Sequence, residues 1–381
     1  MSSEIGERPQ RPGIPVGRAA GVPVYLRPSW FAVAAAVTIL FAPTVRTVAP
    51  EARASAYVVS FGFALLLLIS VLVHELAHAA AAEVAGAPAT HIVLDVWGGH
   101  TAFDSEARGP WRNVFVAAAG PLANVAVAVV VQGTYRAFPI DGTSGLLLEA
   151  TAMANAIVAV LNALPGLPLD GGRVLEGLVW RVTGDRTMAT TIAAWSGRAV
   201  AVTVVGWAVV PAIVPGGAAL AGRSLVGAVW MLVVAGLLWH GAGQALAVAR
   251  WQRRANVATT RALLRPAVTV TPSTSLAVAR AKAEAAGARA IVVLDEDGRP
   301  NGVVDEGAAA MVPFARADAV EAGAVALMLA PQAVVDADLN GPALLERIDG
   351  QRHAHYAVLD GAGNGVVGVL DWETVARFVS G

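Results

Sequence analysis

The run SAYVVSFGFALLLLISVLVHELAHAAAAEVA, residues 55–85, decides the fold class of this chain. It exceeds the roughly 20 apolar residues that a helix needs to cross a bilayer. His74, Glu75 and His78 interrupt it near its end, where a charged group costs at least about 2.5 kcal/mol in hydrocarbon. The run therefore predicts a transmembrane helix that carries a functional site.

The segment VHELAH, residues 73–78, contains the pattern His-Glu-x-x-His. Residues four apart on a helix differ by about 40° around its axis, so His74 and His78 face the same way and can bind one ion. Neutral imidazole nitrogens suit Zn²⁺, and Glu75 is placed to act as the general base toward water. The alternative is that the two histidines occur there by chance and bind no metal. That alternative does not explain why three ionisable side chains lie in an apolar helix.

Further apolar runs of about spanning length follow along the first two thirds of the chain. The composition, 56% apolar and 14% charged, is too apolar for an ordinary soluble protein. The sequence predicts an α-helical polytopic membrane protein with six transmembrane helices, at residues 29–45, 55–85, 114–131, 146–164, 189–214 and 225–249. Residues 1–28 are polar, and we expect a cytoplasmic segment and a retained first span rather than a cleaved signal peptide.

Arginines are distributed unequally between the two ends of these runs. With six spans both termini lie on one side, and arginine marks the cytoplasmic side of a membrane. The connections on the other side are flanked only by Arg46, Arg53, Arg136 and Arg223, whereas the side of the termini holds twelve arginines. Both termini are therefore predicted to be cytoplasmic.

Composition also excludes several kinds of function. The chain contains no cysteine, so disulfides, thiolate metal sites and cysteine nucleophiles are ruled out. Its net charge of −1 argues against a general nucleic-acid partner, which needs a basic excess.

A third metal ligand is predicted in NALPGLPLDGGR, residues 162–173. A catalytic zinc ion takes three protein ligands and keeps one open position, so one ligand must come from outside residues 73–78. Pro165 and Pro168 end the fourth span, which places the carboxylate of Asp170 at the cytoplasmic face. We expect one Zn²⁺ per chain, held by His74, His78 and Asp170.

These motifs together resemble the site-2 protease family of intramembrane zinc proteases over residues 18–250. The resemblance is carried by HELAH in the second span, Gly120-Pro121 with Asn124 in the third, and Asn162 to Gly172 at the end of the fourth. It implies that His74, His78 and Asp170 hold zinc and that Glu75 activates water. It also implies that Asn162 orients the substrate or the oxyanion, although a hydrogen bond between helices would equally explain an Asn there.

The same resemblance implies hydrolysis of a peptide bond in or near a transmembrane segment of a membrane-bound partner. An anti-sigma factor or a membrane-tethered regulator at a bacterial plasma membrane is the kind of substrate it suggests. The segment between His91 and His100 alternates like a strand of a β-hairpin. We expect this small membrane-associated hairpin to hold an unwound substrate by strand addition, and neither flanking histidine to be a ligand.

After a basic linker at residues 251–265 the composition becomes that of a soluble domain. Residues 266–381 form two similar half-units, each a strand, helix, buried strand, turn, strand and helix. They resemble a tandem pair of cystathionine-β-synthase-type (CBS) domains of the α/β class. The resemblance implies a regulatory domain and possible homodimers.

CBS domains commonly bind adenine nucleotides through a Gly-h-h-Ser/Thr-x-x-Asp/Asn pattern after their last strand. GVVDEGA at residues 302–308 and GVLDWET at residues 368–374 both place an aspartate where the hydroxyl should meet phosphate. A carboxylate repels phosphate unless a cation or proton intervenes. We therefore predict that residues 266–381 bind AMP and ATP weakly or not at all, and serve in dimerisation or substrate docking.

Two other classes of function remain open. An ion transporter or channel gated by the CBS pair could use His74, Glu75, His78 and Asp170 as a relay. Such a protein should show an inverted repeat, which the hydropathy pattern lacks. A catalytically inactive scaffold is disfavoured by the intact His-Glu-x-x-His motif and Asp170.

Overall fold

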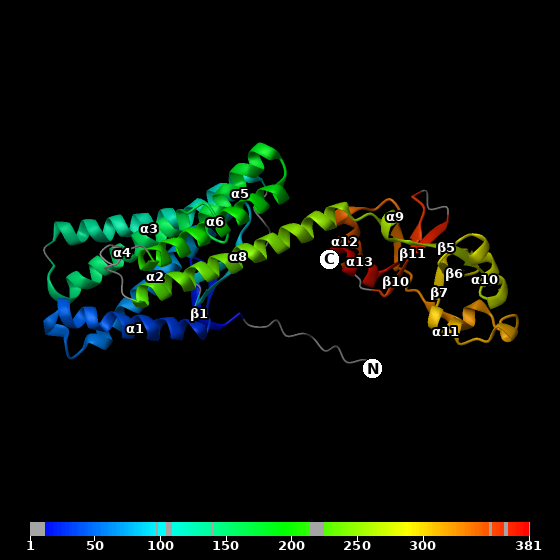
Figure 1. Ribbon diagram of the computed structural model, residues 1–381, viewed down its shortest axis with the longest axis horizontal. Helices are drawn as coiled ribbons and strands as arrows, with labels where there is room; N and C mark the ends of the chain where they lie inside the picture. Colours follow the sequence, from blue (N-terminus) through cyan, green and yellow to red (C-terminus); the bar gives the residue numbers. More distant parts are fainter. Residues whose placement is uncertain are drawn as a thin grey trace. The chain divides into compact units, whose positions relative to one another are not determined.

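The computed structural model describes residues 12–96, 98–103, 109–138, 140–213, 225–349, 353–361 and 365–380. It divides into two compact units, residues 1–247 and residues 248–381. The first is mainly helical and the second combines a β-sheet with short helices (Figure 1).

Six helices of the described chain are long and apolar enough to cross a bilayer. They are α1 (Ser29–Val48), α2 (Ala56–Val84), α3 (Pro110–Ala137), α4 (Gly142–Ala163), α6 (Arg186–Ile213) and α8 (Leu225–Val257). The prediction of a multi-pass membrane protein is confirmed. Large apolar side chains are exposed on these helices, as expected of surfaces that face lipid.

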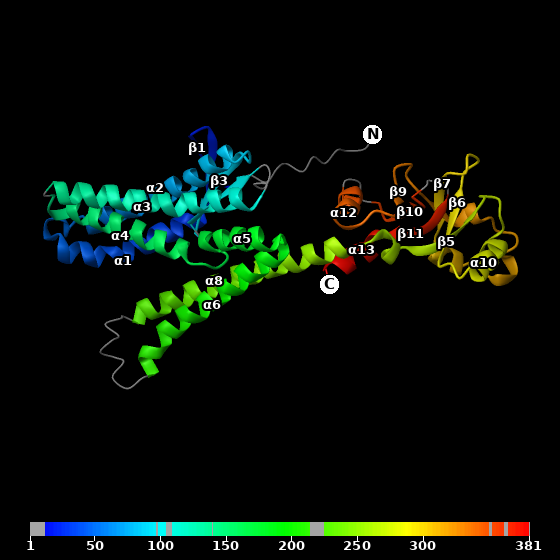
Figure 2. The ribbon, with the colours of Figure 1, turned by 90° about the horizontal axis from the view of Figure 1, so that it is seen from above.

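A further helix, α5 (Asp170–Thr183), follows α4 and was not predicted as a separate element. It begins at Asp170 and ends at Thr183, and the next residue, Gly184, caps it in the left-handed conformation with a φ of 73°. Figure 2 shows α5 as a distinct helix between α4 and α6. The aspartate therefore lies in the first turn of a helix.

The membrane unit also contains a four-stranded sheet. Strands β1 (Ile14–Ala19), β2 (Val22–Leu26), β3 (Ala89–Asp95) and β4 (Gly98–Phe103) are paired in that order. The predicted hairpin is β3–β4, and the N-terminal segment adds a second hairpin through parallel pairing of β2 with β3. The expectation of an isolated hairpin was incomplete, because half of the sheet comes from residues placed in a polar N-terminal segment.

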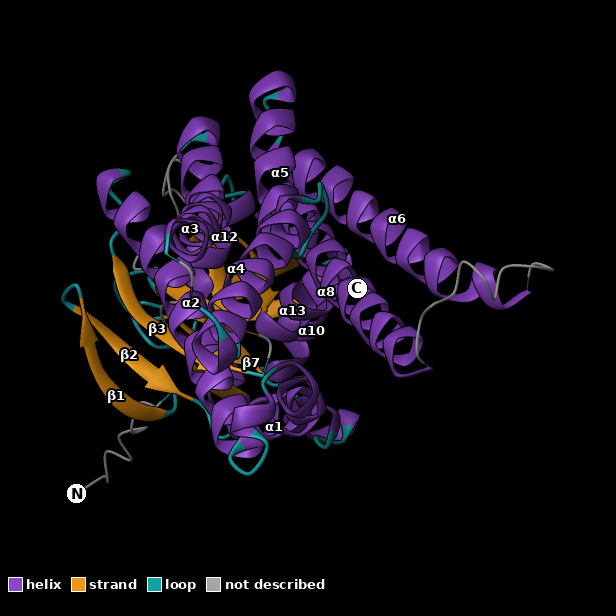
Figure 3. Cartoon of the chain, turned by 90° about the vertical axis from the view of Figure 1, so that its left-hand side faces the viewer, coloured by secondary structure: helices purple, strands orange, loops and turns teal. Residues whose placement is uncertain are grey.

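The sheet packs against α2, the helix that carries the His-Glu-x-x-His motif. Figure 3 shows the strands beside this helix. Val24 of β2, Ile92 and Leu94 of β3 and Ala79 of α2 form one buried apolar cluster. Since β4 has only β3 as a neighbour, its outer edge is unpaired within the described chain.

The second unit is built on one seven-stranded sheet in the order β8-β7-β6-β5-β11-β10-β9. Its strands are β5 (Arg265–Val270), β6 (Ala290–Leu294), β7 (Pro300–Val304), β8 (Ala326–Met328), β9 (Val334–Asp336), β10 (His355–Leu359) and β11 (Val366–Asp371). Its helices are α9 (Thr260–Leu263), α10 (Leu276–Ala285), α11 (Glu306–Ala310), α12 (Gly341–Asp349) and α13 (Trp372–Ser380). The two half-units meet where β5 pairs with β11.

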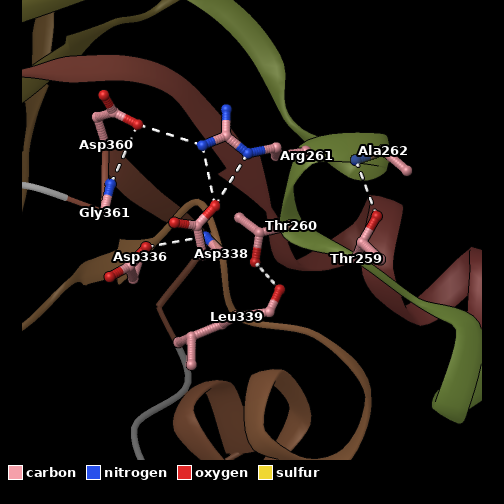
Figure 4. A network of polar contacts seen from close by, with 9 residues as sticks. All are labelled: Thr259, Thr260, Arg261, Ala262, Asp336, Asp338, Leu339, Asp360 and Gly361. Atoms are coloured by element: carbon pink, nitrogen blue, oxygen red, sulfur yellow. Dashed lines mark hydrogen bonds and ion pairs between the residues drawn. The ribbon is translucent and has the colours of Figure 1, made fainter.

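Helix α9, near the start of this unit, makes polar contacts with residues of the second half-unit (Figure 4). Arg261 of α9 donates hydrogen bonds to Asp338 at 2.9 Å and to Asp360 at 3.2 Å. Thr260 donates from its hydroxyl to the carbonyl of Leu339 at 2.8 Å. Residues 251–265, which were expected to form a linker, therefore contain the end of α8 and all of α9. Helix α9 makes polar contacts with the second half of the CBS unit.

Candidate metal centre

Three predicted ligand side chains converge from two helices of the membrane unit. His74 and His78 lie one turn apart on α2, and their Nε2 atoms are 3.1 Å from each other. Asp170, from the first turn of α5, places Oδ2 at 3.1 Å from His74 Nε2 and 3.4 Å from His78 Nε2. Elements nearly 100 residues apart in sequence thus bring two imidazoles and a carboxylate to one point.

Hydrogen bonds on the far side of each imidazole orient its free nitrogen toward this point. His74 Nδ1 lies 3.2 Å from Asn124 Oδ1, and His78 Nδ1 lies 2.8 Å from the carbonyl oxygen of Val116. Both partners are hydrogen-bond acceptors, so the Nδ1 atom of each imidazole carries the hydrogen. In a neutral ring the Nε2 atom then has a free lone pair. Three electron-rich atoms facing one another in a buried site suit a cation.

The spacing of these donor atoms fits zinc. Ligand atoms about 2.0–2.1 Å from a tetrahedral ion lie about 3.3 Å apart. The three separations, 3.1, 3.1 and 3.4 Å, lie close to that value. Two imidazoles and one carboxylate are also a donor set that catalytic zinc uses.

Gly120 of α3 leaves room for the imidazoles. A Cβ atom at this position would lie 2.3 Å from His78 Nε2 and 2.6 Å from His74 Nε2, closer than real atoms approach. From the sequence alone, a helix kink explained Gly120-Pro121 as well as a role in the site did. The structure gives Gly120 a direct steric role, because a side chain there would collide with the imidazoles. Asn124, one turn further along α3, is 1% exposed and orients His74, a role that sequence reasoning missed.

Glu75 lies beside the ligand cluster and is held by the sheet. Its side chain is buried, and Oε2 accepts a hydrogen bond of 2.7 Å from the hydroxyl of Thr101 on β4. Gly99 lies so close that a Cβ there would be 2.8 Å from Glu75 Cγ. Nothing in the sequence pointed to Thr101, which lies just beyond the segment predicted to form the hairpin.

A cavity of about 490 Å³ opens onto these residues. Asn162 and Arg173 line it together with the four predicted site residues, and β4 contributes residues Gly98 to Thr101 and Phe103. Within the described chain the Asn162 side chain makes no hydrogen bond, so the structure gives no support to an interhelical bond at this position.

The remaining histidines do not join the ligand cluster. His100 lines the cavity, but the cluster that could hold an ion consists of His74, His78 and Asp170. His91 contacts Thr90 and packs edge-on against Tyr25. His240 lies 3.0 Å from Gln244 on the next turn of α8.

The segment before α5 is fixed by close backbone contacts. A Cβ on Gly171 would lie 2.4 Å from the carbonyl oxygen of Ala163, and one on Gly172 would lie 2.2 Å from the backbone nitrogen of Leu167. Leu167 donates its N–H to the carbonyl of Ala193 on α6 at 3.0 Å. Both glycines are therefore needed for α5 to begin so close to the end of α4 and to hold Asp170 in place.

Two family models match parts of this chain. Residues 62–139 and 141–206 match the model of Peptidase family M50, and residues 261–309 match that of the CBS domain. Within the membrane unit the chain is therefore similar to Peptidase family M50. The fold class predicted from the sequence, six membrane helices followed by a CBS region, is confirmed.

Curated relatives match about three fifths of this chain. A Synechocystis protein named "Putative zinc metalloprotease sll0528" is 30% identical over 245 residues, which cover 64% of this chain and 62% of the relative. The Mycobacterium tuberculosis protein named "Putative zinc metalloprotease Rip3" is 31% identical over 61% of this chain and 58% of its own length. The chain thus spans about three fifths of these curated relatives.

A solved structure also resembles part of this chain. The site-2 protease from Methanocaldococcus jannaschii covers 61% of this chain and 94% of that chain, with 20% identity and a TM-score of 0.42.

Proposed function

We propose that this protein is a zinc metalloendopeptidase that hydrolyses a peptide bond in or near a transmembrane segment of a membrane-bound partner. The observation that carries this proposal is the convergence of two imidazole nitrogens and one carboxylate, within 3.4 Å of one another, beside a buried glutamate. The names of the relatives, which describe zinc metalloproteases, support the same chemistry.

His74, His78 and Asp170 would hold the ion. Bound there, zinc supplies a Lewis acid that polarises the scissile carbonyl and makes water acidic enough to be deprotonated near neutral pH. Asn124 and the Val116 carbonyl keep the two imidazoles in the tautomer that can bind a cation. Gly120 keeps the space in front of them free.

Glu75 acts as the general base in this proposal and then returns the proton to the leaving amine. Its Oε2 is occupied by the Thr101 hydroxyl, which leaves Oε1 free to take the proton. Because Glu75 faces the cavity next to the ligands but is not one of them, it can move protons without holding metal. Asn162 offers amide donors to the substrate carbonyl from the same cavity.

The unpaired edge of β4 provides a place for an extended substrate. A peptide that pairs with β4 gains backbone hydrogen bonds to replace those of its unwound helix. The strand lines the cavity and its Thr101 touches Glu75, so a peptide paired with its edge would pass close to the base. We infer that substrates enter as strands rather than as intact helices.

Compactness of the site favours hydrolysis over the alternative of an ion relay. His74, Glu75, His78 and Asp170 gather around one cavity instead of following one another along a path through the bilayer. We further propose, from the arginine distribution, that both termini face the cytoplasm of a bacterial plasma membrane. A membrane-tethered regulator or anti-sigma factor is the substrate class that fits this placement.

The CBS unit is proposed to act in dimerisation or docking rather than as a nucleotide sensor. Asp305 caps α11 by accepting a hydrogen bond of 2.8 Å from the N–H of Gly307, so a carboxylate already occupies that helix terminus. Asp371 is paired with Arg265 at 2.8 Å and with His355 at 2.7 Å. Both aspartates are engaged in contacts inside the domain, which supports weak binding of AMP and ATP.

Capture of partners by a Glu75→Gln variant tests the proposed function. The variant should bind the substrate without releasing products, so membrane proteins enriched with it should be cleaved when purified wild-type protein and zinc are added. A Glu75→Gln, His74→Ala double variant controls for proteins that bind elsewhere. If no captured protein is cleaved by the wild-type protein, the assignment as a protease is wrong.

A further inference from the structure

The turn at residues 164–169 leads directly to Asp170, the third of the ligand side chains. Helix α4 ends at Ala163 and α5 begins at Asp170, so the path of this turn sets where the carboxylate lies. Residues of a turn keep a single conformation only where contacts compensate the lost freedom. The position of Asp170 therefore depends on the elements that pack against the turn.

Helix α6 packs against the backbone of this turn. The carbonyl of Ala193 accepts a hydrogen bond of 3.0 Å from the N–H of Leu167, and the hydroxyl of Ser196 donates to the carbonyl of Pro165. Gly197 lies one helical turn after Ala193, on the same face of α6. A Cβ atom on Gly197 would lie 1.9 Å from the carbonyl oxygen of Leu167, so only glycine allows this approach.

Helix α6 also holds α5 itself. The hydroxyl of Thr190 donates a hydrogen bond to the carboxylate of Glu176, which follows Asp170 on α5. Glu176 is buried and takes no part in the proposed mechanism. A buried carboxylate is costly unless a polar partner compensates it, so this contact fixes α5 against α6.

Helix α8 packs against the same turn. A Cβ atom on Gly241 would lie 2.6 Å from Cγ and 3.0 Å from Cδ of Pro168. Leu246 of α8 belongs to a buried apolar cluster that also contains Leu167 of the turn and two alanines of α6. The last two membrane helices of the described chain thus restrict the turn together.

The influence of α6 and α8 on the metal centre is indirect. Among the described residues that line the cavity, none belongs to either helix, and the ligand cluster takes its members from α2 and α5. Any effect of α6 or α8 on the ligands therefore passes through α5 and the turn before it. A zinc–oxygen bond is about 2.0–2.2 Å long, so moving the carboxylate by about 1 Å breaks it.

We propose that Gly197 and Gly241 are positioning residues for the metal centre, through which α6 and α8 determine its affinity for zinc. This inference rests on the proposed function, because it takes Asp170 as a ligand. Real Cβ atoms do not approach within 3.0 Å of a neighbour, so a methyl group on Gly197 must widen its 1.9 Å separation from the Leu167 oxygen. The displaced turn carries the carboxylate of Asp170 away from the two imidazoles.

Metal binding by glycine-to-alanine variants tests this inference. Full-length proteins in nanodiscs are stripped of metal, and Zn²⁺ binding is measured in competition with a chromophoric chelator. Loss of a contact that orients a ligand lowers metal affinity about 10–100-fold, and we expect a loss in this range for Gly197→Ala and Gly241→Ala. Gly206→Ala on α6 and Gly236→Ala on α8 meet nothing within 4 Å and should bind zinc like the wild-type protein.

The visible spectrum of bound Co²⁺ separates a positioning role from a loss of stability. Cobalt can occupy a zinc site, and its absorption bands depend on the geometry of its ligands. We expect the bands of Gly197→Ala to differ from those of the wild-type protein and of Gly206→Ala. A variant that is only less stable would keep the wild-type bands in its folded fraction, and that result would overturn the proposal.

Ser196 offers a milder variant that decides the matter if Gly197→Ala does not fold. Ser196→Ala removes the hydrogen bond to Pro165 without adding an atom, and it should weaken zinc binding about two- to tenfold. Ser196→Thr keeps the hydroxyl and should restore wild-type affinity. An unchanged zinc affinity in Ser196→Ala would overturn the proposal.

Two further outcomes are distinguishable. Equal losses of zinc affinity in Gly197→Ala and Gly206→Ala would show a general effect of substitution in α6, and the positioning role would be wrong. A wild-type protein that takes up no zinc would contradict the proposed function itself. Zinc binding by the wild-type protein with no response in the folded variants would contradict the positioning role alone.

Discussion

Single residues explain how the candidate site is assembled, and some of them were visible in the sequence. His74, His78, Asp170 and Glu75 were predicted because ionisable groups at that spacing in apolar runs indicate a metal site, and the structure brings them together. Thr101 and the role of Asn124 were not predicted. Their contacts with Glu75 and His74 join residues 26 and 50 positions apart, a distance over which sequence spacing alone gives no information.

Replacing Thr101 with valine should slow hydrolysis without removing the metal. The valine fills the same space but cannot donate to Glu75 Oε2, and a hydrogen bond to a charged group contributes about 1.5–3 kcal/mol. We expect kcat to fall at least about tenfold, with KM and zinc content nearly unchanged. Thr101→Ser keeps the hydroxyl and should restore most of the rate, whereas equal losses in both variants would show that Thr101 only packs.

Replacing Gly120 with alanine should prevent zinc binding. The added methyl group would lie within 2.6 Å of both imidazole Nε2 atoms, so at least one ring must turn away. Gly133→Ala on the same helix meets nothing within 4 Å and serves as the matched control. Metal content measured by plasma mass spectrometry should fall well below one zinc per chain in the first variant only, and full loading of Gly120→Ala would contradict this geometry.

At the scale of elements, periodicity predicted the membrane helices but not the parts that complete the site. Their ends shifted by several residues, since helices continue past the apolar run. Helix α5 begins directly after the Pro165–Pro168 turn and lies between the predicted fourth and fifth spans, where no helix was predicted. Strands β1 and β2 come from a polar segment that holds four prolines between residues 12 and 28. They are strands because β1 pairs with β2 and β2 pairs with β3.

The contacts of Asp305 and Asp371 in the CBS unit predict poor nucleotide binding. Calorimetric titration of the full-length Glu75→Gln protein with AMP and with ATP should give dissociation constants above about 1 mM, because each phosphate would meet a carboxylate. Asp305→Ser, which replaces the carboxylate with a hydroxyl at the N-terminus of α11, should bind more tightly than the parent. Micromolar affinity of the parent for either nucleotide would show that the unit senses energy charge.

At the scale of the whole molecule, the arrangement of the loops can be tested by reporter fusions. The segment after α1 lies beside the start of α4, since Thr143 donates a hydrogen bond of 3.0 Å to Glu51. A reporter that works only in the cytoplasm should be active when fused at Gly381 and inactive when inserted near Glu51 or Gly142. The reverse pattern would overturn the topology and the location of the metal centre in the cytoplasmic half of the bilayer.

The central claim is that Glu75 moves protons while His74, His78 and Asp170 hold zinc. Its most direct test measures zinc content and cleavage of a captured membrane substrate in three purified, reconstituted proteins. The wild-type protein should contain one zinc per chain and cut, Glu75→Gln should contain one zinc and not cut, and Asp170→Ala should lose both properties. Cleavage by Glu75→Gln at the wild-type rate, or stoichiometric zinc in a folded Asp170→Ala protein, would contradict the account.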